Sequence, residues 1–253
     1  MLRRPVHLAF VIIAAALFFG GPSLVSVYTD WLWFGELGYQ QVFLTIFGAQ
    51  GTLFTVVLAI AAPWLAGHVR LALASVGDLR PVFTTRDGIE VPLPGRQQLR
   101  LLATAVAVLI AVVVAFVASS QWRTWLMWRN AVPFGQVDPI LGRDAGFYVF
   151  TLPFLQLARQ LAQGLVILAA LAAGALYLVS GSLTSRFGTS VWMTPGARRH
   201  LSFLAAVFLL LLAFGAWLGQ AERLVQPSGV IFGAGYADRS EEHTSELQSR
   251  FGI

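Results

Sequence analysis

Residues 101–122 read LLATAVAVLIAVVVAFVASSQW, and no charged residue interrupts this run. A helix needs about 20 apolar residues to cross the hydrocarbon core of a bilayer, which is roughly 30 Å thick. Backbone amides inside hydrocarbon find no water to bind, so a segment of this kind must satisfy them within a helix. The stretch therefore predicts a transmembrane helix.

Further runs without Asp, Glu or Arg occupy residues 5–29, 37–67, 160–185 and 201–221. We therefore predict an all-α fold, a polytopic bundle of about five transmembrane helices. The predicted spans are residues 6–28, 40–66, 100–121, 161–182 and 201–220. The first run exceeds the 7–15 apolar residues typical of a signal peptide, which favours an uncleaved span. Residues 145–158 are too short to cross and contain Pro153, so we expect an interfacial or re-entrant segment there.

The composition agrees with a membrane environment. Hydrophobic residues make up 57% of the chain and charged residues 11%, whereas a soluble domain has about 25% charged residues. All 17 basic residues are arginines, and they lie between the apolar runs. This placement favours topology signals over a nucleic-acid-binding surface. The absence of cysteine excludes disulfides and thiolate metal sites.

The arginines predict the orientation of the chain. With a cytoplasmic N-terminus, ten of the arginines before residue 238 fall on the inner side and five on the outer side. This asymmetry follows the positive-inside rule and predicts an inner-membrane protein with its N-terminus in the cytoplasm. Most tryptophans then fall at the outer face. We interpret them as an interfacial aromatic belt, the alternative being an aromatic ligand surface.

Two connecting segments carry local structure signals. Asp87-Gly88 lies between the β-favouring runs 82–85 and 89–91, which predicts a hairpin, with a plain loop as the alternative. Trp122, Trp125 and Trp128 recur every three residues. That spacing predicts a short helix on the outer membrane surface.

The candidate site residues are Asp138, Arg143 and Asp144 in the second outer loop. Asp138 precedes a proline and favours a turn, and Arg143 and Asp144 could pair with it. As a functional site this cluster would be an outer-loop contact for an ion or a partner. The competing interpretation, which we favour, is a turn held by local hydrogen bonds.

Catalytic and metal-binding signatures are not found in the sequence. We find no metalloprotease, phosphate-loop or nucleophile-elbow motif. His68 and His200 sit at span ends, and histidines so scattered in the sequence predict no metal site. The apolar runs show no ionisable group near their centres, which is unusual for a transporter. We therefore predict no enzyme activity, no cofactor and no metal for this chain.

The last residues differ abruptly from the rest. Residues 239–249 read RSEEHTSELQS, which resembles the translation of a common sequencing-library adapter. We interpret residues 239–253 as a non-native tail and residues 1–238 as the transmembrane helical region. On this interpretation the chain is a fragment.

Three stretches carry a family resemblance. Residues 31–39 (WLWFGELGY), 138–154 (DPILGRDAGFYVFTLPF) and 229–236 (GVIFGAGY) resemble the uncharacterised protein family 0182. The resemblance implies a bacterial integral membrane protein with about seven N-terminal spans followed by a large soluble region. It implies no catalytic residues, because the biochemical role of the family is unknown.

These observations lead to three functional hypotheses. The first is a structural or scaffolding membrane protein whose missing C-terminal region is extracytoplasmic. Its partners would be the lipid bilayer and either envelope proteins or further copies of itself, with no nucleic acid. The alternative is a transporter or channel subunit, for which Gln50, Thr52, Thr55 and Gln163 are the available polar groups. The third is an enzyme whose active site lies in the missing region.

Overall fold

The computed structural model describes the backbone of residues 3–75, 82–84, 90–92, 96–186, 190–225, 227–228 and 231–232, and the side chains of residues 20–75, 97–184 and 192–225. The chain divides into two compact units, residues 1–52 and 53–253, and the second helix crosses the division. The helices are α1 (Arg3–Glu36), α2 (Gln40–Ser75), α3 (Arg96–Ser119), α4 (Trp122–Arg129), α5 (Leu152–Val179) and α6 (Pro195–Arg223). A π-helical turn, η1 (Phe147–Thr151), leads directly into α5.

Four of the described helices are long and apolar enough to cross a membrane. They occupy Gln40–Ser75, Gln97–Ser119, Phe147–Val179 and Pro195–Arg223. Only 11–28% of the most apolar window of each helix is buried inside the protein. The helices therefore expose apolar surface that water would not tolerate, as expected for a bundle solvated by lipid. The fifth expected span lies in α1, where the side chains before Gly20 are outside the described residues, so it stays a prediction.

Short hairpins lie between or after the helices. β1 (Val82–Thr84) pairs antiparallel with β2 (Glu90–Pro92), which confirms the strands of the predicted hairpin. Its Asp87-Gly88 turn lies outside the described residues. The sequence did not indicate the hairpin of β3 (Leu183–Arg186) and β4 (Ser190–Met193), nor that of β5 (Pro227–Ser228) and β6 (Ile231–Phe232).

The first unit holds a tight turn between α1 and α2. Gly38 adopts φ +73°, a conformation that only glycine enters easily. The N–H of Tyr39 donates to the carbonyl of Phe34 at 2.8 Å, and the ring of Phe34 lies 5.9 Å from that of Phe43. The helix α1 therefore continues to Glu36, and the turn is shorter than the gap between the predicted spans 6–28 and 40–66.

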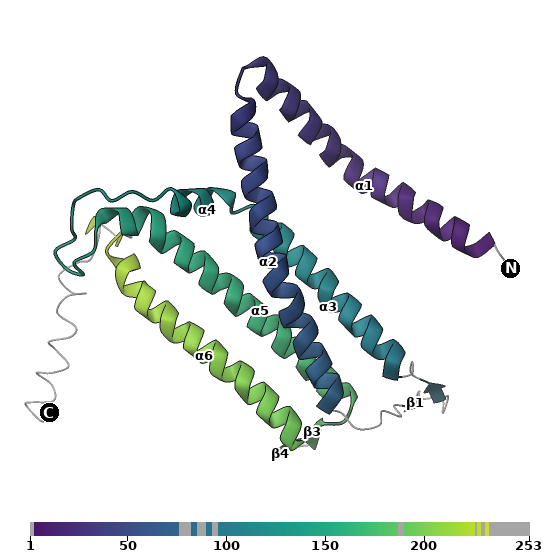
Figure 1. The fold of residues 1–253 in the computed structure, drawn as a ribbon. Helices are drawn as coiled ribbons and strands as arrows, with labels where there is room; N and C mark the ends of the chain where they lie inside the picture. The colour runs from purple at the N-terminus through teal and green to yellow at the C-terminus, as the bar shows by residue number, and fades with distance from the viewer. Residues whose placement is uncertain are drawn as a thin grey trace, which may run out of the picture. The chain divides into compact units, whose positions relative to one another are not determined.

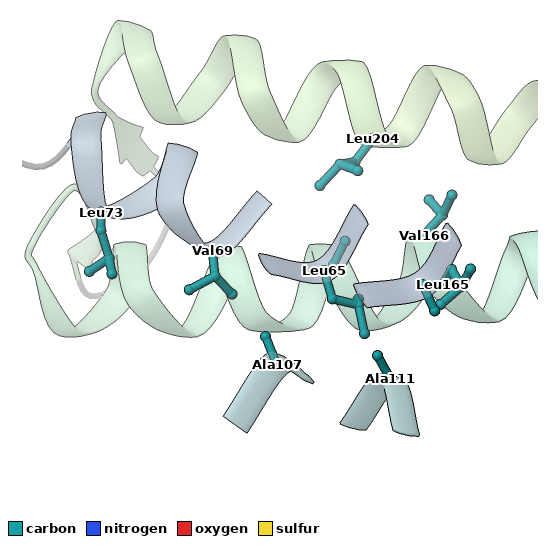
Figure 2. Close-up of a cluster of buried hydrophobic side chains, with 10 residues drawn as sticks. Leu65, Val69, Leu73, Ala107, Ala111, Leu165, Val166 and Leu204 are labelled. Atoms are coloured by element: carbon teal, nitrogen blue, oxygen red, sulfur yellow. The ribbon is translucent and has the colours of Figure 1, made fainter. Parts of the chain in front are cut away.

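The second unit has its core where α2, α3, α5 and α6 converge. Figure 1 shows α5 and α6 side by side and antiparallel, and these two helices share the most extensive contact. Small residues let the helices approach closely: Ala107 and Ala111 of α3 and Ala169 of α5 are almost fully buried. Figure 2 shows leucines and valines of the other helices filling the space around them. The larger side chains of this core are Leu65, Val69, Leu73, Leu165, Val166 and Leu204.

The beginning of α5 corrects one expectation. Residues 145–158 do not form a separate interfacial or re-entrant segment, because η1 and α5 make one continuous helix from Phe147 to Val179. Pro153 is the second residue of α5 and follows the π turn directly. The N–H of Leu152 donates to the carbonyl of Phe147, and this wider turn carries the chain past the proline.

Candidate functional site: two polar clusters at opposite ends of the α5–α6 pair

The first cluster is the aspartate loop, which we define as residues 133–148. Asp144 organises it by accepting three backbone hydrogen bonds, from Phe134 (2.9 Å), Gly135 (2.8 Å) and Gly146 (2.7 Å). These N–H groups hold the pKa of Asp144 below its ordinary value, the bond from Phe134 contributing most. A Cβ added at Gly146 would lie 2.5 Å from the carbonyl oxygen of Val132, so only glycine fits there.

Asp138 closes the other half of the loop. Its carboxylate accepts from the N–H of Leu141 at 2.6 Å and from the hydroxyl of Tyr148 at 3.0 Å. Burial would raise the pKa of Asp138, but the N–H groups of Leu141 and Ile140 and the Tyr148 hydroxyl outweigh it and lower the pKa. The backbone completes the turn, since the N–H of Asp138 donates to the carbonyl of Arg143 at 2.8 Å.

Arg143 does not pair with either aspartate, although we expected that it could. Within the described residues it makes no ion pair, and its guanidinium lies 4.2 Å from the ring centre of Phe147 and 5.0 Å from that of Trp217. The two rings attract the cation through their negative faces and join the loop to α6. Arg143 also lines a small cavity of about 110 Å³ with Leu141 and Gln220.

The three predicted site residues are therefore neighbours in one loop with separate roles. Both carboxylates bind hydrogen-bond donors of their own loop, which supports the structural interpretation of this segment. An ion or partner contact at Asp138, Arg143 and Asp144 stays a prediction. Nearby, α4 confirms the short helix predicted from the tryptophan spacing, and Trp128 stacks on Phe154 of α5 with ring centres 4.1 Å apart.

The second cluster, at the other end of the α5–α6 pair, was missed by the sequence analysis. We call it the histidine network: Ser75 and His68 of α2, Tyr177 of α5 and His200 of α6. Tyr177 is fully buried and His68 is 7% exposed. His68 and His200 are 132 residues apart in sequence, yet a ring nitrogen of one lies 2.7 Å from a ring nitrogen of the other.

The proton positions in this network can be assigned from Ser75, because its backbone partner is a carbonyl that can only accept. The hydroxyl of Ser75 donates to the carbonyl of Ala72, so the hydroxyl of Tyr177 donates to Ser75 at 2.9 Å. The oxygen of Tyr177 then accepts from Nδ1–H of His200 at 2.8 Å. Neutral His200 accepts at Nε2 from Nδ1–H of His68. Each group therefore donates to the next in the order His68, His200, Tyr177, Ser75. The network links α2, α5 and α6.

The same region changes the interpretation of Trp64. The positive-inside orientation puts it at the inner face, but Trp64 is partly buried and its Nε1–H donates to the carbonyl of Leu165 at 3.2 Å. Its ring also meets that of His68 at 4.4 Å in an edge-to-face arrangement. Trp64 therefore packs within the bundle beside the histidine network.

An arginine lies inside the helix α5, just before the uncharged run 160–185 from which the span was predicted. Arg159 is part of the continuous helix Phe147–Val179 and donates from Nη1 to the side-chain oxygen of Gln163. Its Nε is buried without a hydrogen-bond partner. Gly215 of α6 makes room for it, because an added Cβ would lie 3.1 Å from Nη1. The sequence concealed this because the helix begins before the uncharged run.

No group of three or more His, Cys, Asp or Glu side chains suited to a metal ion is found within the part of the chain that the structure describes. The histidine network holds two histidines, a tyrosine and a serine, whose polar atoms bind one another. Its observable chemistry is therefore hydrogen bonding between helices.

The comparisons with known proteins find relatives along most of the chain. The chain is 33% identical over 240 residues to a UPF0182 protein of Geobacter sp. (strain M21), covering 92% of this chain and 26% of that protein. It is 36% identical over 220 residues to a UPF0182 protein of Rhodococcus opacus (strain B4), covering 85% and 22%. It is 33% identical over 237 residues to a UPF0182 protein of Corynebacterium jeikeium (strain K411), covering 90% and 22%.

The chain thus spans about a quarter of the length of these relatives. No solved structure matches it. The model of the uncharacterised protein family (UPF0182) matches residues 7–247, a match that ends inside residues 239–253, whose origin stays a prediction. With nearly the whole sequence matched and bacterial relatives covering most of it, the chain belongs to the uncharacterised protein family UPF0182.

Proposed function

We propose that the chain is the membrane-embedded part of a scaffolding protein of the bacterial inner membrane, without catalytic residues of its own. On this proposal it spans the membrane five times with a cytoplasmic N-terminus, and the region that the longer relatives contain is extracytoplasmic. Its partners are lipid and either other envelope proteins or a second copy. The aspartate loop is the surface that contacts the partner.

The observation that carries this proposal is the exposed apolar surface of a loop with a defined conformation. Val137 is 65% exposed, Ile140 52% and Phe134 49%. The carboxylates of Asp138 and Asp144 fix the backbone that presents them. Apolar side chains grouped on an ordered loop mark a contact surface, and a preorganised loop loses little conformational entropy on binding.

A crosslinking experiment tests the contact. A photo-crosslinking residue at Val137 should capture one defined protein in intact cells, whereas the same residue at Asn130, an exposed polar position after α4, should not. Equal capture at both positions, or capture of lipid alone at Val137, would contradict a partner surface. The topology is tested separately by reporters fused after Asp238. A reporter that works only in the periplasm should be active there, and a reporter that works only in the cytoplasm should be inactive.

The second candidate function is a transporter or channel subunit, and Arg159 favours it. Arg159 lies at one end of the uncharged run of α5 and contacts Gln163, one of the polar groups noted in the sequence, and charged side chains that face the interior of a bundle often mark a transport path. The histidine network adds a chain of hydrogen bonds between His68 and Ser75. A proton can pass along such a chain when donor and acceptor exchange roles in every bond. Between these groups, however, Leu165, Val166, Ala169 and Ala173 of α5 are buried and apolar.

Flux measurements separate the two functions. A transporter should show substrate flux in proteoliposomes that Gln163→Ala abolishes and that exposed Gln98→Ala leaves unchanged. A scaffold should show no flux in either case. It should also keep its crosslinking partner when Gln163 is replaced.

A further inference from the structure

A groove between α2 and α3 combines two arginines with an apolar wall. Its volume is about 440 Å³, within the range of about 300–1,000 Å³ typical of ligand sites. Arg70, Leu73 and Ala74 of α2 line one side, and Gln97 and Arg100 of α3 line the other. It is separate from the aspartate loop, the histidine network and Arg159.

The two guanidinium groups are exposed and lack hydrogen-bond or ion-pair partners among the described residues. Each arginine marks the boundary of an apolar segment. The chain from Gln40 to Val69 has no charged side chain before Arg70, and residues 101–119 have none after Arg100. Val69 and Leu73 belong to the buried core. Once the helices are embedded in lipid, the guanidinium groups lie where hydrocarbon meets headgroups.

We propose that this groove binds the phosphate of an anionic phospholipid, a proposal that rests on the membrane embedding argued above. Arg70 of α2 and Arg100 of α3 bind the phosphate from two sides. Each planar guanidinium can donate two parallel hydrogen bonds to the phosphate oxygens. Gln97 provides an amide donor for the headgroup. Leu73 and Ala74 follow Arg70 in α2 and form the apolar wall beside the headgroup.

The N-terminus of α3 strengthens the attraction of the groove for a phosphate. Gln97 and Arg100 lie in its first turns, where the helix dipole is positive, and no acidic residue occupies the first turn. Basic pockets between transmembrane helices near one membrane face are suited to anionic headgroups. Because Arg70 and Arg100 both border uncharged apolar segments, a phosphate bound between them would lie at the depth of the lipid headgroups, so the groove fits a lipid better than a free phosphate ion.

The same features could arise from arginines that serve only as topology signals, and a matched variant distinguishes the two. Arg198 and Arg199 lie at the start of α6, at the same end of the bundle, because His200 beside them contacts His68 of α2. They are exposed and do not line the groove. Arg198→Gln/Arg199→Gln therefore removes the same charge as Arg70→Gln/Arg100→Gln.

The experiment uses the full chain, purified in detergent and mixed with vesicles containing labelled phosphatidylglycerol or labelled phosphatidylcholine. The unchanged chain should retain phosphatidylglycerol preferentially. Each groove arginine should contribute about fivefold, so Arg70→Gln/Arg100→Gln should weaken retention by about 25-fold. Arg198→Gln/Arg199→Gln should weaken it by less than about threefold. Arg70→Lys/Arg100→Lys keeps the charge and should lose only part of the preference.

Several outcomes would overturn the proposal. Equal losses in the groove variant and the Arg198/Arg199 variant would mean general surface charge, and equal retention of both lipids would mean no headgroup site. Binding of inorganic phosphate that displaces no phosphatidylglycerol would place the anion elsewhere. Carbonate extraction of each variant from membranes is measured in parallel. Release of the unchanged chain would refute the membrane embedding, whereas loss of lipid preference in a carbonate-resistant chain refutes the groove alone.

Discussion

Removing one oxygen atom from the histidine network should measurably weaken the bundle. Tyr177→Phe keeps the buried ring and deletes the hydroxyl that bonds Ser75 and His200. Nδ1–H of His200 then has no acceptor, and the Ser75 oxygen loses its donor. A buried donor left without a partner costs about 1–3 kcal/mol in water-soluble proteins. Hydrogen bonds between membrane helices are weaker, averaging about 0.6 kcal/mol with a maximum near 1.7.

Two bonds of this strength give a loss of about 1–2 kcal/mol in the free energy of unfolding. The measurement is a reversible unfolding titration with sodium dodecyl sulfate in mixed micelles. Tyr39→Phe is the control, because Tyr39 is 61% exposed and its hydroxyl has no hydrogen bond among the described residues. It should change the free energy by less than about 0.3 kcal/mol, the scale expected for an exposed substitution.

A double-mutant cycle tests whether Tyr177 and Ser75 interact as the structure shows. Ser75→Ala and Tyr177→Phe remove opposite ends of the same bond, so their combined effect should be smaller than the sum by about 0.5 kcal/mol or more. The reasoning is refuted if Tyr177→Phe matches the Tyr39→Phe control. It is also refuted if the two effects add, since the oxygens would then not be bonded in the membrane.

Three further predictions concern the opposite end of the α5–α6 pair. The pKa of Asp144 is lower in the folded loop than in the unfolded chain, so its contribution is present above pH 3.8 and is lost as the pH falls through the folded value; hydrogen exchange of the amides of Phe134, Gly135 and Gly146 should accelerate over that range, and Asp144→Asn should remove the pH dependence at these amides while Asp138 keeps its own at Leu141. Gly215→Ala should destabilise the α5–α6 contact by about 1 kcal/mol relative to Gly219→Ala, because only Gly215 faces Arg159 closely; equal unfolding free energies would contradict this packing. Gly146→Ala should expose the loop amides to rapid exchange at neutral pH, because an added Cβ would collide with a backbone carbonyl; unchanged protection would show that the loop can rearrange.

The sequence predicted the features that depend on local composition. Uncharged runs of sufficient length located the apolar helices, because crossing hydrocarbon imposes length and internal hydrogen bonding on each segment separately. The spacing of Trp122, Trp125 and Trp128 predicted α4, and the β-favouring runs around Asp87-Gly88 predicted the strands β1 and β2. In each case neighbouring residues carry the signal.

Features that depend on contacts between distant residues could not be predicted in the same way. The histidine network joins His68 to His200, and nothing near either residue shows that α2 and α6 bring them together. The helix that contains Arg159 begins earlier than expected, because Pro153 was taken as a helix breaker while a π turn precedes it. Because successive spans cross the membrane in opposite directions, the end of α2 and the start of α6 lie at the same membrane face. The sequence therefore places His68 and His200 at one face, although it does not show that they touch.

The spacing of Arg159 and Tyr177 on α5 has a consequence for bilayer thickness. Eighteen residues of helix separate them, a rise of roughly 27 Å, which is close to the thickness of the hydrocarbon layer. Arg159 and the polar partners of Tyr177 therefore resist sliding or tilting of α5, because either movement would draw one of them into the lipid tails. The turns of helix preceding Arg159 then rise clear of the acyl chains and carry the aspartate loop into the aqueous phase.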